Sequence, residues 1–103
     1  MSRRAKLEQM LQREPDDVFI TYGLAMELVK EGRMDEAMQR FDRVLQLDPA
    51  YTTAYFQKGS ALLSHGRLDE AVAVLQSGIA AARKAGDHHA ADEMGALLES
   101  ARS

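Results

Sequence analysis

The sequence contains no cysteine, so it offers no disulfide, no thiol nucleophile and no thiolate ligand for a metal. It has no tryptophan and only two prolines among 103 residues. A formal net charge of -3, with basic residues scattered among acidic ones, gives no electrostatic attraction to nucleic acid. No run approaches the roughly 20 apolar residues that a membrane-spanning helix needs. These absences favour the cytoplasm and argue against nucleic acid and membranes as partners.

The abundant residues predict helices. Long stretches are rich in Ala, Leu, Glu, Gln, Arg and Met, which lose little rotamer freedom on a helical backbone. Apolar residues recur at intervals of three and four, which is typical of amphipathic helices. The pattern predicts an all-α chain with about six helices, at about residues 3–13, 17–30, 35–47, 52–64, 69–84 and 88–101.

Prolines, glycines and alanines recur at an interval of 34 residues, as between Pro15 and Pro49. The segment GRMDEA at 32–37 returns as GRLDEA at 66–71. Its glycine suits the left-handed backbone conformation that ends a helix. Its aspartate lies near the next helix start, where a carboxylate satisfies free backbone N–H groups. Connections this short predict antiparallel neighbouring helices.

This period resembles the tetratricopeptide repeat (TPR), whose pattern runs W-x2-L-G-x2-Y, then A-x3-F, then P. The first repeat matches with Thr21, Leu24, Ala25, Leu28, Ala37, Phe41 and Pro49, and only the tryptophan place is badly missed. The second matches more loosely, with Tyr55, Lys58, Gly59, Leu62, Ala71 and Leu75, and Arg83 replaces the proline.

The resemblance covers nearly the whole chain and implies a small bacterial-type TPR protein. It implies a right-handed superhelical solenoid of antiparallel helix pairs, forming one domain over residues 1–103. The parts would be a half-repeat helix at 2–15, repeats at 18–51 and 52–85, and a closing helix at 88–101. Small residues would permit close approach where helices cross, namely Ala25, Gly59, Gly95, Ala37 and Ala71.

In this family the first helix of each repeat lines a concave groove. Beside the core stripe of the first repeat lies a second apolar stripe, which equivalent places in the second repeat continue. The candidate partner-binding groove is Phe19, Tyr22, Met26, Val29, Phe56, Ser60 and Leu63. Three interpretations stay open: a groove for a peptide or protein segment, an interface between two copies of the chain, or a surface that fills itself.

Other chemistry has weak support in the sequence. The carboxylate clamp of this family uses lysine, asparagine and arginine. The corresponding groove places here hold Tyr22, Met26, Gln57, His89 and Glu93. The pairs His88 with Asp92 and His89 with Glu93 each offer fewer than the three or four ligands that zinc needs. Without a catalytic triad or phosphate loop, we expect no enzyme activity, metal or cofactor, and instead a non-catalytic protein–protein interaction module.

Lys58 occupies a place that the family usually fills with leucine between paired helices. Its aliphatic stem is expected to pack, while its amine reaches water or a carboxylate such as Asp69 or Glu70. The alternative is that Lys58 is a groove cation for an acidic partner.

Overall fold

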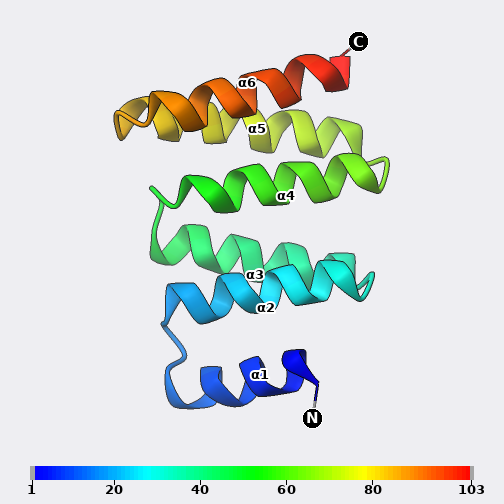
Figure 1. The fold of residues 1–103 in the computed structure, drawn as a ribbon, viewed down its shortest axis with the longest axis vertical. Helices are drawn as coiled ribbons and strands as arrows, with labels where there is room; N and C mark the ends of the chain where they lie inside the picture. The colour runs from blue at the N-terminus through cyan, green and yellow to red at the C-terminus, as the bar shows by residue number, and fades with distance from the viewer. Residues whose placement is uncertain (1, 103) are drawn as a thin grey trace. The chain divides into compact units, whose positions relative to one another are not determined.

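The computed structural model describes residues 2–102, and all regular structure in that range is helical. The helices are α1 (Arg3–Arg13), α2 (Val18–Lys30), α3 (Met34–Leu47), α4 (Thr52–Ser64), α5 (Leu68–Lys84) and α6 (His88–Arg102), shown in Figure 1. Every predicted helix end agrees to within about one residue, which is the usual uncertainty of such boundaries. The all-α prediction is confirmed. Within the described range, no helix combines the length and apolar character needed to cross a membrane.

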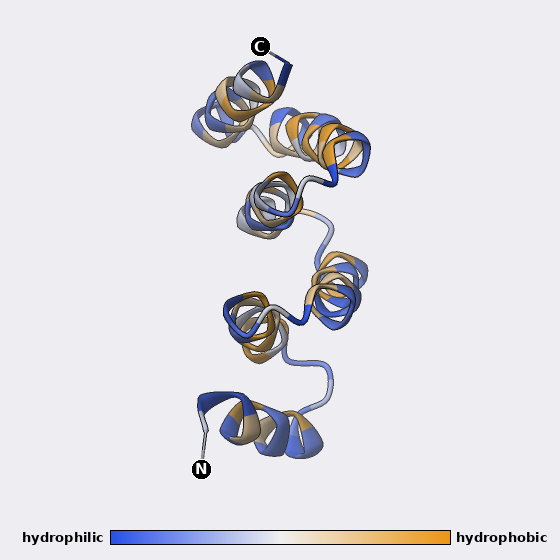
Figure 2. Ribbon diagram, turned by 90° about the vertical axis from the view of Figure 1, so that its right-hand side faces the viewer, coloured by the Kyte–Doolittle hydropathy of each residue, from blue (hydrophilic) through white to orange (hydrophobic). Residues whose placement is uncertain are grey.

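The helices form two compact units, one ending at Pro49 and the other beginning at Ala50. In the first unit, α2 packs against both α1 and α3. In the second, α5 packs against both α4 and α6, and α4 also touches α6. Figure 2 shows α4 and α6 on one side of this unit and α5 on the other.

Three helices end in the same turn. Gly32, Gly66 and Gly86 have φ angles of 76°, 73° and 76°, a region that glycine occupies without strain. At the first turn, the Gly32 N–H donates to the Val29 carbonyl at 3.0 Å and the Arg33 N–H donates to the Leu28 carbonyl at 2.9 Å. This double closure satisfies carbonyls that a helix end leaves free. The predicted turns at Gly32 and Gly66 are confirmed, and Gly86 adds a third.

Asp35 and Asp69 lie near the starts of α3 and α5, as predicted, but they are not the N-cap residues. The N-cap residues of α3 and α5 are Arg33 and Arg67, and neither side chain makes a capping hydrogen bond. Asp35 and Asp69 therefore lie inside the first turn, where their negative charge favours the helix N-terminus. Side-chain caps occur instead elsewhere, as at Asp17, which accepts from the Ile20 N–H at 2.8 Å.

Small residues set the helix crossings. The predicted core stripe of α2 is buried, and Ala25 and Ala37 are fully buried. A Cβ on Gly59 would lie 2.6 Å from Leu75 Cδ2, so the predicted close approach there is confirmed. A Cβ on Gly95 would meet nothing within 4 Å, so the predicted packing role of Gly95 is wrong.

The tightest crossing of the second unit lies at Gly78. A Cβ there would be 2.5 Å from Met94 Sδ and 2.6 Å from Tyr55 Cβ. Helices α4, α5 and α6 therefore converge on this one residue of α5. The core around it consists of Leu75, Ala82, Ala91, Met94 and Leu98.

Candidate functional site

A pocket of about 350 Å³ lies in the second unit, between the N-terminal halves of α4 and α6. Such a volume stands at the lower end of ligand sites, which run from about 300 to 1,000 Å³. The pocket therefore suits one or two side chains of a larger partner. Its walls include Thr53, Phe56 and Gln57 from α4 and His89, Glu93 and Met94 from α6.

Asp87 holds the two walls together. Its Oδ1 accepts from the Ala90 N–H at 3.1 Å, so Asp87 caps the start of α6. Its Oδ2 accepts from the Thr52 hydroxyl at 3.3 Å, at the start of α4. One carboxylate thus joins the first turns of both helices, and the positive end of α6 stabilises its charge.

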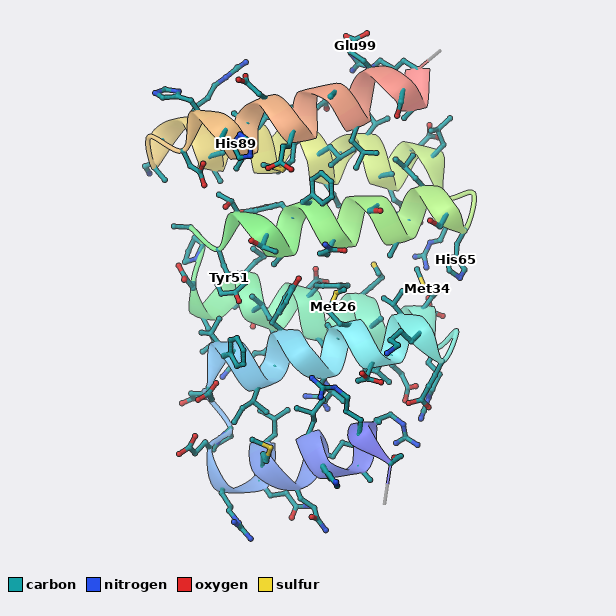
Figure 3. All side chains as sticks on the ribbon, viewed as in Figure 1. Met26, Met34, Tyr51, His65, His89 and Glu99 are labelled. Atoms are coloured by element: carbon teal, nitrogen blue, oxygen red, sulfur yellow. The ribbon has the colours of Figure 1, made fainter. Side chains whose placement is uncertain are left out.

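The pocket has exposed acidic character beside an apolar floor. His89 Nε2 lies 3.1 Å from Glu93 Oε1, and these side chains are 88% and 53% exposed. Figure 3 labels His89 in the first turns of α6. Met94 is fully buried and forms the floor. None of the described lining residues is a lysine or arginine.

Two polar side chains of the α4 wall are available for hydrogen bonding. Within residues 2–102, neither the Gln57 amide nor the Thr53 hydroxyl makes a hydrogen bond to the protein. An amide both donates and accepts, as the backbone of an extended peptide requires. These side chains can therefore form hydrogen bonds with the backbone of a peptide segment that loses its bonds to water on binding.

The predicted groove residues of the second unit have different surroundings. Phe56 lines the pocket and also packs against the core cluster. Leu63 packs against the same cluster but does not line the pocket. Ser60 is half-buried, and its carbonyl accepts from the Ser64 hydroxyl at 3.0 Å. The structure thus brings Phe56 together with residues of α6.

The predicted groove residues of the first unit all lie on α2. Phe19 is 76% exposed, whereas Tyr22, Met26 and Val29 are half-buried. The Tyr22 ring meets the buried Phe41 ring edge to face, with centroids 6.3 Å apart, so it packs on α3. That all seven residues form one groove stays a prediction.

Lys58 is half-buried, as its predicted stem packing requires. A hydrogen bond from Arg67 lowers the pKa of Glu70, and the positive charges of Arg67 and Lys58 add to that shift. The ammonium group of Lys58 therefore acts electrostatically on one of the two carboxylates named from the sequence.

Sequence reasoning missed two features that shape this site. The hydrogen bond from Thr52 to Asp87 links residues 35 apart in the chain, and the repeat pattern does not predict it. Gly78 brings Met94 against α5, and its signal was a glycine in the interior of a strong helix. Such a glycine costs about 1 kcal/mol relative to alanine and therefore needs a packing reason.

Antiparallel helix pairs closed by equivalent glycine turns define an α-helical repeat protein. The family model described as tetratricopeptide repeat matches residues 28–93, well over half of the chain. The chain belongs to the tetratricopeptide repeat family.

Known relatives agree with this assignment. A TPR repeat-containing protein of Pseudomonas aeruginosa is 29% identical over 92 residues, which are 89% of this chain and 88% of that protein. The solution structure of a Bordetella parapertussis protein has a TM-score of 0.84 and 25% identity, covering 99% of this chain and 89% of the other. The TPR2B domain of yeast Sti1, solved in complex with pHsp70, has the same fold, with a TM-score of 0.85 and 21% identity over 96% of this chain and 75% of the other.

Proposed function

We propose that this protein is a non-catalytic module that binds a segment of another protein, with the pocket between α4 and α6 as its main contact. The observation that carries this proposal is the pocket of about 350 Å³, whose lining combines Phe56 with the unpaired amide of Gln57. An apolar anchor beside convergent polar groups is the common composition of a binding site. The yeast Sti1 domain, solved with a protein partner, supports a binding role for this fold.

The exposed stripe of α2 supplies a second surface for the same role. Phe19 is 76% exposed, so most of this apolar residue is in contact with water. Burying such a side chain completely would gain about 1.5–3 kcal/mol. Because association itself costs about 4–15 kcal/mol, Phe19 can contribute to an interface but cannot hold a partner alone.

Self-association is the second candidate function, and the exposure of Phe19 favours it. A two-fold dimer would place the same α2 surface of each copy against the other. Light scattering on a sizing column, over a wide range of concentration, separates the two candidates. A dimer that Phe19→Glu converts to folded monomer would support self-association, whereas a monomer at every concentration would exclude it.

The pocket is tested by selecting random displayed peptides that bind the 103-residue protein. Gln57→Arg places a long side chain at the α4 wall and is expected to abolish binding of the selected peptides. Gln76→Arg, the same substitution at an exposed position of α5, is the matched control and should leave binding unchanged. Peptides that bind both variants equally would show that the pocket is not the contact.

A further inference from the structure

The described residues that line the α4–α6 pocket include two carboxylates and no lysine or arginine, which favours a positively charged ligand. We propose that the pocket accepts an arginine side chain of the bound segment, an inference that rests on the proposed function. The guanidinium would lie beside the Glu93 carboxylate and the Phe56 ring, with its methylene stem over Met94.

Of the two carboxylates in the pocket, Glu93 is the one available to a cation. Both oxygens of Asp87 already accept hydrogen bonds, from Ala90 and Thr52, and Asp87 stands at the positive end of α6. Among the described residues, Glu93 lies beside the His89 side chain, which is 88% exposed, and the Glu93 side chain is itself 53% exposed. A guanidinium offers two parallel N–H donors and a permanent charge, so it would replace the imidazole.

The apolar part of the pocket suits the same side chain. Phe56 has one side against the core cluster and another toward the pocket, which holds its ring in place. Guanidinium groups stack on aromatic rings, and thioethers make adaptable contacts with aliphatic stems. A pocket of about 350 Å³ leaves room for one long side chain and the backbone that carries it.

The competing ligands fit less well. An acidic side chain would meet Glu93 and Asp87, with no lysine or arginine among the described lining residues. Lysine has the right charge, but its compact and strongly hydrated ammonium lacks the bidentate geometry and stacks less. The side chains of Gln57 and Thr53 remain for the peptide backbone on either side of the arginine.

To test this, the random peptides that bind the wild-type protein but not the Gln57→Arg variant are sequenced. The expected result is enrichment of arginine at one position. Replacing that arginine by citrulline, which has nearly the same shape without the charge, should weaken binding about tenfold, because an ion pair and a stacking contact are both lost.

A matched pair of protein variants tests the assigned carboxylate. Glu93→Gln should weaken binding of the arginine peptide about fivefold, the effect of one exposed ion pair. Glu99→Gln, on the same helix but outside the pocket, should leave it unchanged; Figure 3 shows Glu99 and His89 well apart along α6.

The outcomes separate this inference from the proposed function. Peptides that depend on the pocket but lack an enriched arginine would overturn the inference and leave the proposed function standing. Equal binding of the arginine peptide to Glu93→Gln and wild type would also overturn it. Failure to select any pocket-dependent peptide would overturn both.

Discussion

Helices α1 and α6 are attached to their units in different ways. α1 contains no buried residue. It packs against α2 at Gly23. A Cβ added to Gly23 would lie 3.5 Å from Leu7 Cδ2, which is ordinary van der Waals contact. Two ion pairs complete the attachment, Arg3–Glu27 at 2.9 Å and Arg4–Glu31 at 3.0 Å.

α6, by contrast, shares the core of its unit. Its residues Ala91, Met94 and Leu98 are buried, and it packs on both α4 and α5. The comparison shows that a flanking helix can be attached by half-buried contacts with ion pairs, as in α1, or by a shared buried core, as in α6. Apolar burial gives the stronger attachment, because ion pairs that water can reach on one side are weakened by water and salt.

The largest expected effect comes from Met94→Ala, which removes a fully buried side chain from the meeting point of three helices. We expect a loss of about 2–5 kcal/mol in the free energy of unfolding of the second unit. The matched control is Met10→Ala on α1, where the side chain is 46% exposed and the loss should stay below about 0.5 kcal/mol. Urea unfolding measures both, and equal losses would contradict the comparison.

The next effect concerns two glycines of the second unit. Gly78→Ala would place a methyl group against Met94 and Tyr55, which should destabilise the protein by about 1–3 kcal/mol despite the better helix propensity of alanine. Gly95→Ala meets no such obstacle and should stabilise by about 0.5–1 kcal/mol. Thermal unfolding of both variants shows whether each substitution raises or lowers stability. Stabilisation by Gly78→Ala would contradict the close packing of Met94 and Tyr55 against Gly78.

A smaller effect is expected from Glu27→Gln, which removes the carboxylate that pairs with Arg3. Amide hydrogens of α1 should exchange about two- to fivefold faster, because Arg3, whose side chain is 72% exposed, loses its ion-pair partner. Added salt should reduce the difference between variant and wild type. Hydrogen exchange in α6 is the internal control, and acceleration there as well would show general destabilisation.

The smallest effect is a change in one pKa. The hydrogen bond from Arg67 lowers the pKa of Glu70, so Arg67→Ala should raise it toward the ordinary value. Lys58→Met should raise it less, because Lys58 acts through charge alone. The stabilisation linked to this lowered pKa is present above the unfolded-state pKa and is lost as the pH falls through the folded-state pKa. An NMR titration of the Glu70 carboxyl measures each shift.

Local features of the fold were accessible from the sequence. Gly32 and Gly66 predicted the turns because few other residues adopt a positive φ without strain. Ala37 and Ala71 predicted the helix crossings because their spacing repeats and large side chains would not fit there. These features depend on one residue and its near neighbours.

The candidate site was less accessible because it depends on pairs of distant residues. Phe56 and Glu93 each appeared at groove places in the sequence, but only the packing of α6 on α4 puts them in one pocket. Gly95 was assigned a packing role from its alignment with Gly59, although the two have different surroundings. A repeat pattern predicts which positions are equivalent and not which neighbours each copy has.

The three glycine turns also bear on how such a chain can grow. The intervals between them differ, since Gly66 follows Gly32 by 34 residues and Gly86 follows Gly66 by 20. Each turn closes onto carbonyls of the helix that it ends, so its geometry does not depend on the length of the next helix. Duplication of a short gene segment that encodes one helix and its terminal glycine turn would therefore add a single helix, just as duplication of a longer segment would add a whole repeat.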